Sequence, residues 1–238
     1  MSNSFDQYAE GYEASLDQGL RLSGEGRAYF LKNRIDYLYH KLAGMRVTCQ
    51  SFLDFGCGDG ETVAYVEKSR FSQVCLGVDP SKGLIAKAKA NHVASPGAFV
   101  ELEKQWSGPS VDLVHCNGVF HHIDPDGRGQ ALEWVQNALI EGGYFAFFEN
   151  NPWNLGTRWV MSRIPFDRDA KVVSPRAATR MLRQAGFEIL SLDALFFFPR
   201  WFAMMRPFER FLRNVPLGAQ YLVLARKPAG NDKGTIAS

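Results

Sequence analysis

The sequence predicts an α/β fold in which a doubly wound, mostly parallel sheet is covered by helices on both faces. Short apolar runs bounded by glycine or proline alternate with stretches of helical periodicity, the pattern of successive strand–helix units. The runs are nearly continuously apolar, as in strands that are buried on both faces. The 238 residues are 46% hydrophobic and 22% charged, which is typical of a globular domain.

The predicted elements follow one another along the chain. Residues 5–42 have helical periodicity, and Gly24 with Gly26 favours two helices joined by a turn. The next elements are strands at 51–55, 74–78, 98–100, 111–116 and 144–148, with helices at 61–68, 82–92 and 130–139. A helix at 175–185 ends at Gly186, a natural C-terminal cap, and strands at 187–198 and 219–227 complete the sheet.

Charge and cysteine content limit the class of protein. Lys and Arg number 27 and Asp and Glu 25, so the net charge of +2 disfavours nucleic acid as a partner. The four cysteines form no CxxC pair and show no metal-ligand spacing, which predicts a reduced protein and no metal site. The first residues lack the basic and apolar regions of a signal peptide, and no window approaches the ~20 apolar residues of a membrane span. We therefore expect a cytoplasmic protein without a transmembrane segment.

A glycine-rich loop follows the first predicted strand. Gly56, Gly58 and Gly60 carry no Cβ, so a ligand can lie against the backbone, and the next helix directs its free N–H groups at the loop. Asp79 ends the second strand, 19 residues after Gly60. A carboxylate there can accept hydrogen bonds from both hydroxyls of a ribose. The pattern predicts a nucleoside site.

The acidic residues around this loop indicate which nucleoside binds. A dinucleotide fingerprint would place a third glycine at position 61, where this chain has Glu61. The carboxylates of Asp54 and Asp59 would repel a pyrophosphate, whereas they suit the ammonium and sulfonium of an aminoacyl nucleoside. This favours S-adenosylmethionine over NAD.

Four motifs in order resemble those of the class I S-adenosylmethionine-dependent methyltransferases. They are LDFGCGDG, GVDPS, VDLVHCNGVFHHI and LIEGGYFAFFE, and they extend from about Ser51 to Glu149. The resemblance implies a Rossmann-like sheet of seven strands, mostly parallel with an antiparallel last strand, and a helical N-terminal lid. We expect one methyltransferase domain over 1–238, divided into a helical cap (1–46), a cofactor-binding core (47–150), a substrate-side segment with the last two strands (151–227) and a disordered tail (228–238).

The resemblance also implies the residues that hold the cofactor. The glycines contact its methionine part, Asp54 lies near the ammonium, Asp79 binds the ribose, and Asn117 lies under the methionine or the sulfonium. The full set is Asp54, Gly56, Cys57, Gly58, Gly60, Asp79, Pro80 and Asn117. The family's acidic residue against the adenine amine could be Glu101 or Glu103, and the sequence leaves that choice open.

Methyl transfer needs positioning of the acceptor, and a base where the acceptor must lose a proton. His121 and His122 follow the fourth strand and are the candidate bases, because histidine titrates near neutral pH. The alternative is that these histidines mainly order the loop.

The segment after the fifth strand supplies candidate acceptor-binding residues at the edge of the sheet where ligands bind. These are Glu149, Asn150, Asn151, Trp153 and Asn154. The alternative is an Asn-Pro turn anchored by a buried tryptophan. Residues 165–169 could complete the same wall.

Residues 199–213 predict an amphipathic helix. Trp201, Met204, Met205, Phe208, Phe211 and Leu212 share one face, and Arg206, Arg210 and Arg213 share the opposite face. Such a helix can roof a pocket or pack on a neighbour, or it can lie on an anionic membrane.

These observations favour a methyltransferase acting on a small-molecule or lipid- or sugar-linked acceptor, with oxygen as the favoured atom. Two alternatives stay open at this point. One is a non-catalytic S-adenosylmethionine-binding regulator or partner subunit, and the other is an NAD-dependent oxidoreductase.

Overall fold

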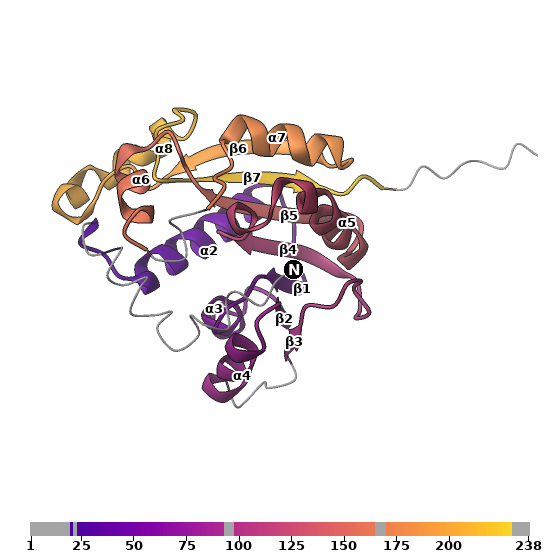
Figure 1. The fold of residues 1–238 in the computed structure, drawn as a ribbon. Helices are drawn as coiled ribbons and strands as arrows, with labels where there is room; N and C mark the ends of the chain where they lie inside the picture. The colour runs from indigo at the N-terminus through magenta and orange to yellow at the C-terminus, as the bar shows by residue number, and fades with distance from the viewer. Residues whose placement is uncertain (1–19, 21–22, 93–97, 165–169, 230–238) are drawn as a thin grey trace, which may run out of the picture.

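Seven strands form a single mixed sheet in the computed structural model, which describes residues 20, 23–92, 98–164 and 170–229. The strands are β1 (Ser51–Phe55), β2 (Val74–Asp79), β3 (Phe99–Glu101), β4 (Val111–Asn117), β5 (Leu139–Asn150), β6 (Glu188–Leu195) and β7 (Gln220–Arg226). Their order is β3-β2-β1-β4-β5-β7-β6 (Figure 1). β7 is antiparallel to both of its neighbours and the other pairs are parallel, so the predicted fold class is confirmed.

Helices cover both faces of this sheet (Figure 1). On one face, α2 (Arg27–Gly44) and α3 (Glu61–Ser69) bury apolar side chains such as Leu38 and Val66 against Phe52 and Phe148. α4 (Lys82–Asn91) packs beside β3 in a smaller cluster. On the other face, α5 (Arg128–Ala138) and α7 (Pro175–Gln184) form the largest core cluster. Short 3₁₀ turns, η4 (Phe120–His122) and η5 (Pro125–Gly127), precede α5.

The chain reverses its direction of winding between β1 and β4. In the sheet, β2 and β3 lie on one side of β1, and β5, β7 and β6 lie on the other side of β4. Loops that leave the carboxyl ends of β1 and β4 therefore diverge, and an open α/β sheet binds its ligands in the resulting crevice. This position carries the candidate site.

Most of the predicted elements agree with the structure, with three differences. β5 begins at Leu139, earlier than predicted, because a register shift in its pairing with β4 accommodates Gly142 and Gly143. α6 (Leu155–Met161) was not predicted; Asn154 caps it by accepting a hydrogen bond from the Thr157 N–H. Of the two helices predicted within residues 5–42, the second corresponds to α2, which begins directly after Gly26. The first lies almost wholly outside the residues that the structure describes.

The predicted amphipathic helix at 199–213 has a different backbone. It consists of a 3₁₀ stretch, η6 (Arg200–Phe208), followed by the short helix α8 (Glu209–Leu212). Phe202 has non-helical torsions (φ −109°, ψ 25°) and breaks the helical repeat. Arg206 consequently turns inward, where its guanidinium bonds Glu25 at 2.8 Å and lies over the Tyr29 ring. The expectation that Arg206 shares an outer face with Arg210 and Arg213 is therefore wrong.

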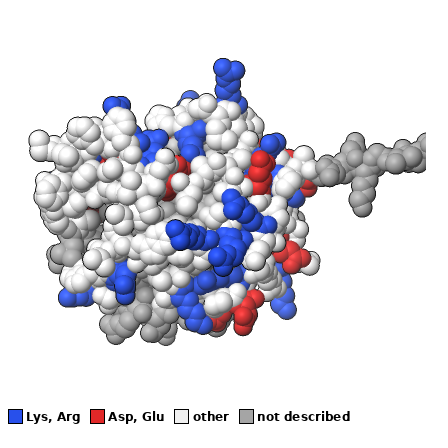
Figure 2. Space-filling model, turned by 90° about the horizontal axis from the view of Figure 1, so that it is seen from above, with Lys and Arg blue, Asp and Glu red and all other residues white. Residues whose placement is uncertain are grey.

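Among the described residues, no helix has both the length and the apolar character needed to cross a membrane. Basic side chains are distributed unevenly over the surface. Lys and Arg gather in the middle of one face, over α7, which carries Arg176, Arg180 and Arg183 (Figure 2).

Candidate functional site

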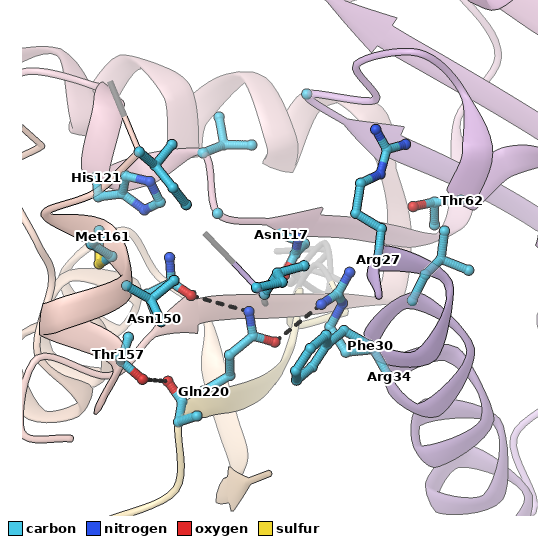
Figure 3. A pocket seen from close by; sticks show the side chains of 18 of the residues that line it. Arg27, Phe30, Arg34, Thr62, Asn117, His121, Asn150, Thr157, Met161 and Gln220 are labelled. Atoms are coloured by element: carbon cyan, nitrogen blue, oxygen red, sulfur yellow. Dashed lines mark hydrogen bonds between the residues drawn. The ribbon is translucent and has the colours of Figure 1, made fainter. Parts of the chain in front are cut away.

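A cavity of about 860 Å³ opens at the carboxyl ends of β1, β2, β4 and β5 (Figure 3). α2 closes one side of it, and η6 with the turn before it closes another. This volume falls within the ~300–1,000 Å³ of small-molecule sites. The cavity brings together residues from sequence segments that are up to about 200 positions apart, among them Leu20 and Gln220.

The glycine-rich loop after β1 forms one end of the cavity. Gly56, Gly58 and Gly60 all have positive φ angles, of 79°, 54° and 85°. A Cβ on Gly56 would come within 2.4 Å of Val119 Cγ2, so only glycine fits there. The backbone N–H groups of Gly56 and Cys57 donate to the Val78 carbonyl, which fixes the loop against the end of β2.

Asp79 at the end of β2 is buried and lines the cavity beside Pro80. Its Oδ2 accepts a hydrogen bond from the Gly58 N–H at 3.0 Å, and its Oδ1 accepts one from the Ser81 N–H at 2.9 Å. These two backbone bonds fix the orientation of the carboxylate at the cavity wall. Asp79 therefore braces the glycine loop in addition to facing the cavity.

A buried pair, Asp54 and His115, lies at the centre of the sheet edge. The two residues are register partners on β1 and β4, and His115 Nδ1 lies 2.7 Å from Asp54 Oδ1. Within the described structure, His115 Nε2 and Asn117 Oδ1 are buried atoms that have no hydrogen-bond partner. Both residues line the cavity. Leaving such atoms unpaired costs about 1–3 kcal/mol each, so they suit a wall that a polar ligand completes.

An ion-pair cluster connects α2 with the glycine loop. The Arg27 guanidinium lies 2.7 Å from Asp59 Oδ2 and 2.6 Å from Glu61 Oε2, and all three residues line the cavity. Burial lowers the pKa of Arg27, but the two carboxylates more than offset this effect, so the pKa is raised overall. Asp59 and Glu61 are thus partly neutralised. Sequence patterns did not single out Arg27, because its partners are more than 30 positions away.

The Cys57 thiol also lines this end of the cavity. Burial raises its pKa well above the ordinary value, and the nearby carboxylates of Asp54 and Asp79 raise it further. The thiol is therefore neutral and acts as a packing group rather than as a nucleophile.

His121 and Glu149 form the most ordered polar pair on the opposite part of the wall. His121 Nδ1 lies 2.6 Å from Glu149 Oε2, and both side chains are buried. The same carboxylate accepts hydrogen bonds from the N–H groups of Phe120, His121 and Asn150. The Oε2 atom can accept a hydrogen bond from an N–H on His121 Nδ1. The other ring nitrogen, Nε2, lies on the side away from Glu149.

A chain of hydrogen bonds between side chains crosses the cavity from α2 to β5 (Figure 3). Arg34 Nη1 donates to Gln220 Oε1 at 3.1 Å, and Gln220 Nε2 donates to Asn150 Oδ1, also at 3.1 Å. Asn150 and Gln220 are register partners on β5 and β7. Because Asn150 Oδ1 is used in this chain, its Nδ2 group is the donor available to a ligand. Arg34 and Gln220 were not predicted, since neither belongs to a local motif.

The structure separates the five predicted acceptor-binding residues. Asn150 and Asn154 line the cavity, as does His122. Glu149, Asn151 and Trp153 are not among the described residues that line it. Asn151 is fully buried, and its Nδ2 group donates to the carbonyls of Pro216 and Gly218. The predicted stretch 165–169 lies outside the described residues.

The region expected to face adenine contains Leu102, Leu84 and Pro80 on the cavity wall. Glu101 and Glu103 are both exposed, and neither belongs to the described lining. Glu101 Oε2 is 3.7 Å from Lys82 Nζ, and Glu103 accepts a hydrogen bond from Ser107. In the described structure both carboxylates thus bond at the surface rather than at the cavity wall.

The remaining wall is apolar and largely aromatic. It is built by α2, by α6 and by the segment between β6 and α8, and its members include Tyr29, Phe30, Trp159, Met161, Ile164, Phe196, Phe197, Phe198 and Trp201. The cavity therefore has a polar strip for a reacting group and a hydrophobic surface for a carbon skeleton.

The fold is an open α/β sheet with a glycine-rich loop at the end of its first strand, beside the cavity. The sequence profile of a family described as "Methyltransferase domain" matches residues 26–192. The chain belongs to this family, the class I S-adenosylmethionine-dependent methyltransferases, and S-adenosylmethionine is its cofactor. No curated protein matches the chain by sequence.

Solved structures with the same fold share little sequence with this chain. One is a methyltransferase in complex with the Haloferax volcanii Trm112 activator, with 18% identity, coverage of 96% of this chain and 99% of that one, and a TM-score of 0.62. Another is a TehB-like methyltransferase from Corynebacterium glutamicum, with 21% identity, 93% and 98% coverage and a TM-score of 0.61. The [4+2]-cyclase SpnF is also similar, with 19% identity, 82% and 81% coverage and a TM-score of 0.56. The shared fold therefore does not specify the acceptor.

Proposed function

We propose that this methyltransferase transfers its methyl group to a hydroxyl oxygen of a small molecule, free or linked to a lipid or sugar. The observation that carries the proposal is the buried His121–Glu149 pair, which borders the cavity at a 2.6 Å separation. A histidine oriented by a carboxylate is the arrangement of a general base. An acceptor oxygen that must lose a proton requires such a base.

The opposite end of the cavity suits the cofactor. Carboxylates at Asp54 and Asp79, the positive-φ glycines and the buried acceptors on His115 and Asn117 match an aminoacyl nucleoside with an ammonium and a ribose. We propose that the cofactor is held by Asp54, Gly56, Cys57, Gly58, Gly60, Asp79, Pro80 and Asn117. When bound, S-adenosylmethionine supplies a methyl group that its sulfonium has already activated.

The protein's own contribution is orientation and proton transfer. Glu149 fixes the His121 ring through Nδ1, so Nε2 is the nitrogen that takes the hydroxyl proton as the acceptor oxygen attacks. The amide chain through Gln220 fixes Asn150, whose Nδ2 group can donate to the acceptor. The aromatic wall excludes water from the reacting groups.

Two further features support the partner and the compartment that we propose. The site is a cavity rather than an open basic groove, which suits a small acceptor better than RNA or DNA. All four cysteines are free thiols, which agrees with a reducing compartment such as the cytoplasm.

The proposal is tested by incubating the protein and methyl-labelled S-adenosylmethionine with fractionated small-molecule extracts and identifying the labelled product. With that acceptor, His121→Gln should lower kcat by about 10²–10⁴-fold and leave S-adenosylhomocysteine affinity unchanged. His122→Gln is the matched control, because His122 is the adjacent histidine on the same turn, whereas the 2.6 Å contact with Glu149 is made by His121. We expect at most a few-fold loss there.

The pH profile gives an independent readout. The wild-type rate should fall as the pH is lowered and His121 becomes protonated, and His121→Gln should lose this dependence. Label on nitrogen or carbon, or equal losses in the two histidine variants, would contradict the proposal.

A further inference from the structure

The end of the molecule that carries α6, η6 and α8 exposes an unusual number of large apolar side chains. More than half of the exposed large hydrophobic residues of the described structure lie within residues 153–159 and 201–217. Met204 is 84% exposed, Phe211 68% and Trp201 63%. We call this surface the aromatic end; it comprises Trp153, Leu155, Trp159, Trp201, Phe202, Met204, Met205, Phe208, Phe211, Val215 and Leu217.

The charges around the aromatic end are almost all positive. Exposed arginines lie within the same segments, namely Arg158, Arg163, Arg200, Arg210 and Arg213. In the described ranges 151–164 and 199–217 the single acid is Glu209, whose carboxylate accepts hydrogen bonds from the backbone N–H groups of Phe197 and Phe198. Figure 2 shows this end, at the left, as a largely white surface beside the basic side chains over α7.

The aromatic end is continuous with the cavity. Trp159 and Trp201 are exposed at the surface and also line the cavity. Phe198 and Pro199, which are half-buried, line it as well. Part of the cavity wall is therefore continuous with an apolar surface bordered by arginines. A molecule that leaves an apolar phase at this surface would meet the aromatic wall first and the polar strip at Asn150 afterwards.

We propose that the aromatic end docks on an anionic lipid bilayer and that the methyl acceptor is an amphipathic molecule taken from that bilayer. Exposed Trp, Phe and Met side chains insert at the headgroup boundary, while arginines contact anionic headgroups. The positive border and the shortage of acids favour a bilayer over a protein with mixed charges. The identity of the acceptor, but not the docking itself, rests on the proposed methyl transfer.

The docking is tested with the full chain by vesicle co-sedimentation. Vesicles of phosphatidylcholine with about one third phosphatidylglycerol should retain the protein, and vesicles of pure phosphatidylcholine should retain much less. Raising the salt concentration should weaken the binding, because the headgroup contribution is electrostatic. Each vesicle sample is paired with a titration of S-adenosylhomocysteine, which reports an intact cofactor site independently of membrane binding.

Two pairs of variants locate the surface. Met204→Glu combined with Phe211→Glu should abolish retention, whereas Val74→Glu, an exposed apolar position at the start of β2, should not. Arg210→Glu should lower vesicle affinity on the order of tenfold, whereas Lys68→Glu on α3 should change it little. None of these five residues lines the cavity among the described residues, so all four variants should still bind S-adenosylhomocysteine.

Three results would overturn the proposal. The first is an intact protein that binds S-adenosylhomocysteine but does not sediment with anionic vesicles. The second is equal retention of the Met204→Glu/Phe211→Glu variant and the wild type. The third is a wild-type dimer that this double variant converts to a monomer, which would make the aromatic end a contact between two copies. Loss of S-adenosylhomocysteine binding with vesicle binding intact would instead contradict the cofactor site and leave the docking standing.

Discussion

The two halves of the cavity are built in different ways. The proposed cofactor half uses the ends of β1 and β2 and the loop between β1 and α3, so its residues other than Asn117 are close in the sequence. The acceptor half is assembled from α2, the end of β5, α6, η6 and the start of β7, which are far apart in the sequence. The first half is fixed by backbone hydrogen bonds, and the second by side chains that bond across elements.

This difference shows how one fold can keep its cofactor and change its acceptor. The hydrogen bonds from the Gly56 and Cys57 N–H groups to the Val78 carbonyl join backbone to backbone, so they persist when side chains in the acceptor half are replaced. The acceptor half can change by substitution of single side chains such as Gln220 or by a new loop conformation. Variants in each half should therefore separate cofactor affinity from acceptor recognition.

The largest effect is expected at Glu149, where the two halves meet. Glu149→Ala would leave His121 Nδ1 and the N–H groups of Phe120 and Asn150 without their buried acceptor. Breaking such a network costs about 3–5 kcal/mol of the free energy of unfolding, which urea denaturation would measure. Glu133→Ala on the exposed side of α5 is the control. Equal midpoints for the two variants would show that this network does not stabilise the fold.

The next effect concerns the cofactor half. Asp79→Ala removes a carboxylate that braces Gly58 and that is proposed to bind the ribose. Two lost hydrogen bonds to a charged group amount to about 3 kcal/mol or more, so titration calorimetry should show at least a hundredfold weaker binding of S-adenosylhomocysteine. Glu133→Ala, on the exposed side of α5, should change the affinity little. A wild-type affinity in Asp79→Ala would remove Asp79 from the ribose site.

A smaller effect is expected where α2 meets the glycine loop. Arg27→Gln breaks the contacts with Asp59 and Glu61, and we expect about 1–2 kcal/mol weaker binding of S-adenosylhomocysteine because the loop loses its brace. Lys32→Gln on the same helix removes an exposed ion pair with Asp36 and should have little effect. If both variants bind like the wild type, α2 packs beside the cofactor half without stabilising it.

The smallest effect should appear in the acceptor half alone. Gln220→Leu breaks the amide chain between Arg34 and Asn150 but keeps the side-chain volume. We expect the acceptor KM to rise about fivefold, equivalent to ~1 kcal/mol, with S-adenosylhomocysteine affinity unchanged. A change in cofactor affinity instead would show that the two halves are not independent.

Much of the cofactor half was accessible from sequence. The strand at 51–55 and the helix that begins at Glu61 lie where the periodicity and the glycines predicted them. The acceptor half was less accessible. α6 lacks a recognisable apolar period, and the 199–213 segment has a helical pattern but a 3₁₀ backbone broken at Phe202. His115 could have been suspected as a histidine within a buried strand, whereas Arg34 gave no local signal.

The sequence by itself determined the succession of strands and helices along the chain, the position of the glycine loop and the acid at the end of β2. These features depend on short-range periodicity and backbone conformation. Only the tertiary structure decided that Glu149 and Asn151 point into the protein, that Arg27 joins the loop, and that Arg34, Gln220 and Asn150 form one chain. The physical reason is that such contacts join residues brought together by the sheet, and their energies depend on distances that no local pattern encodes.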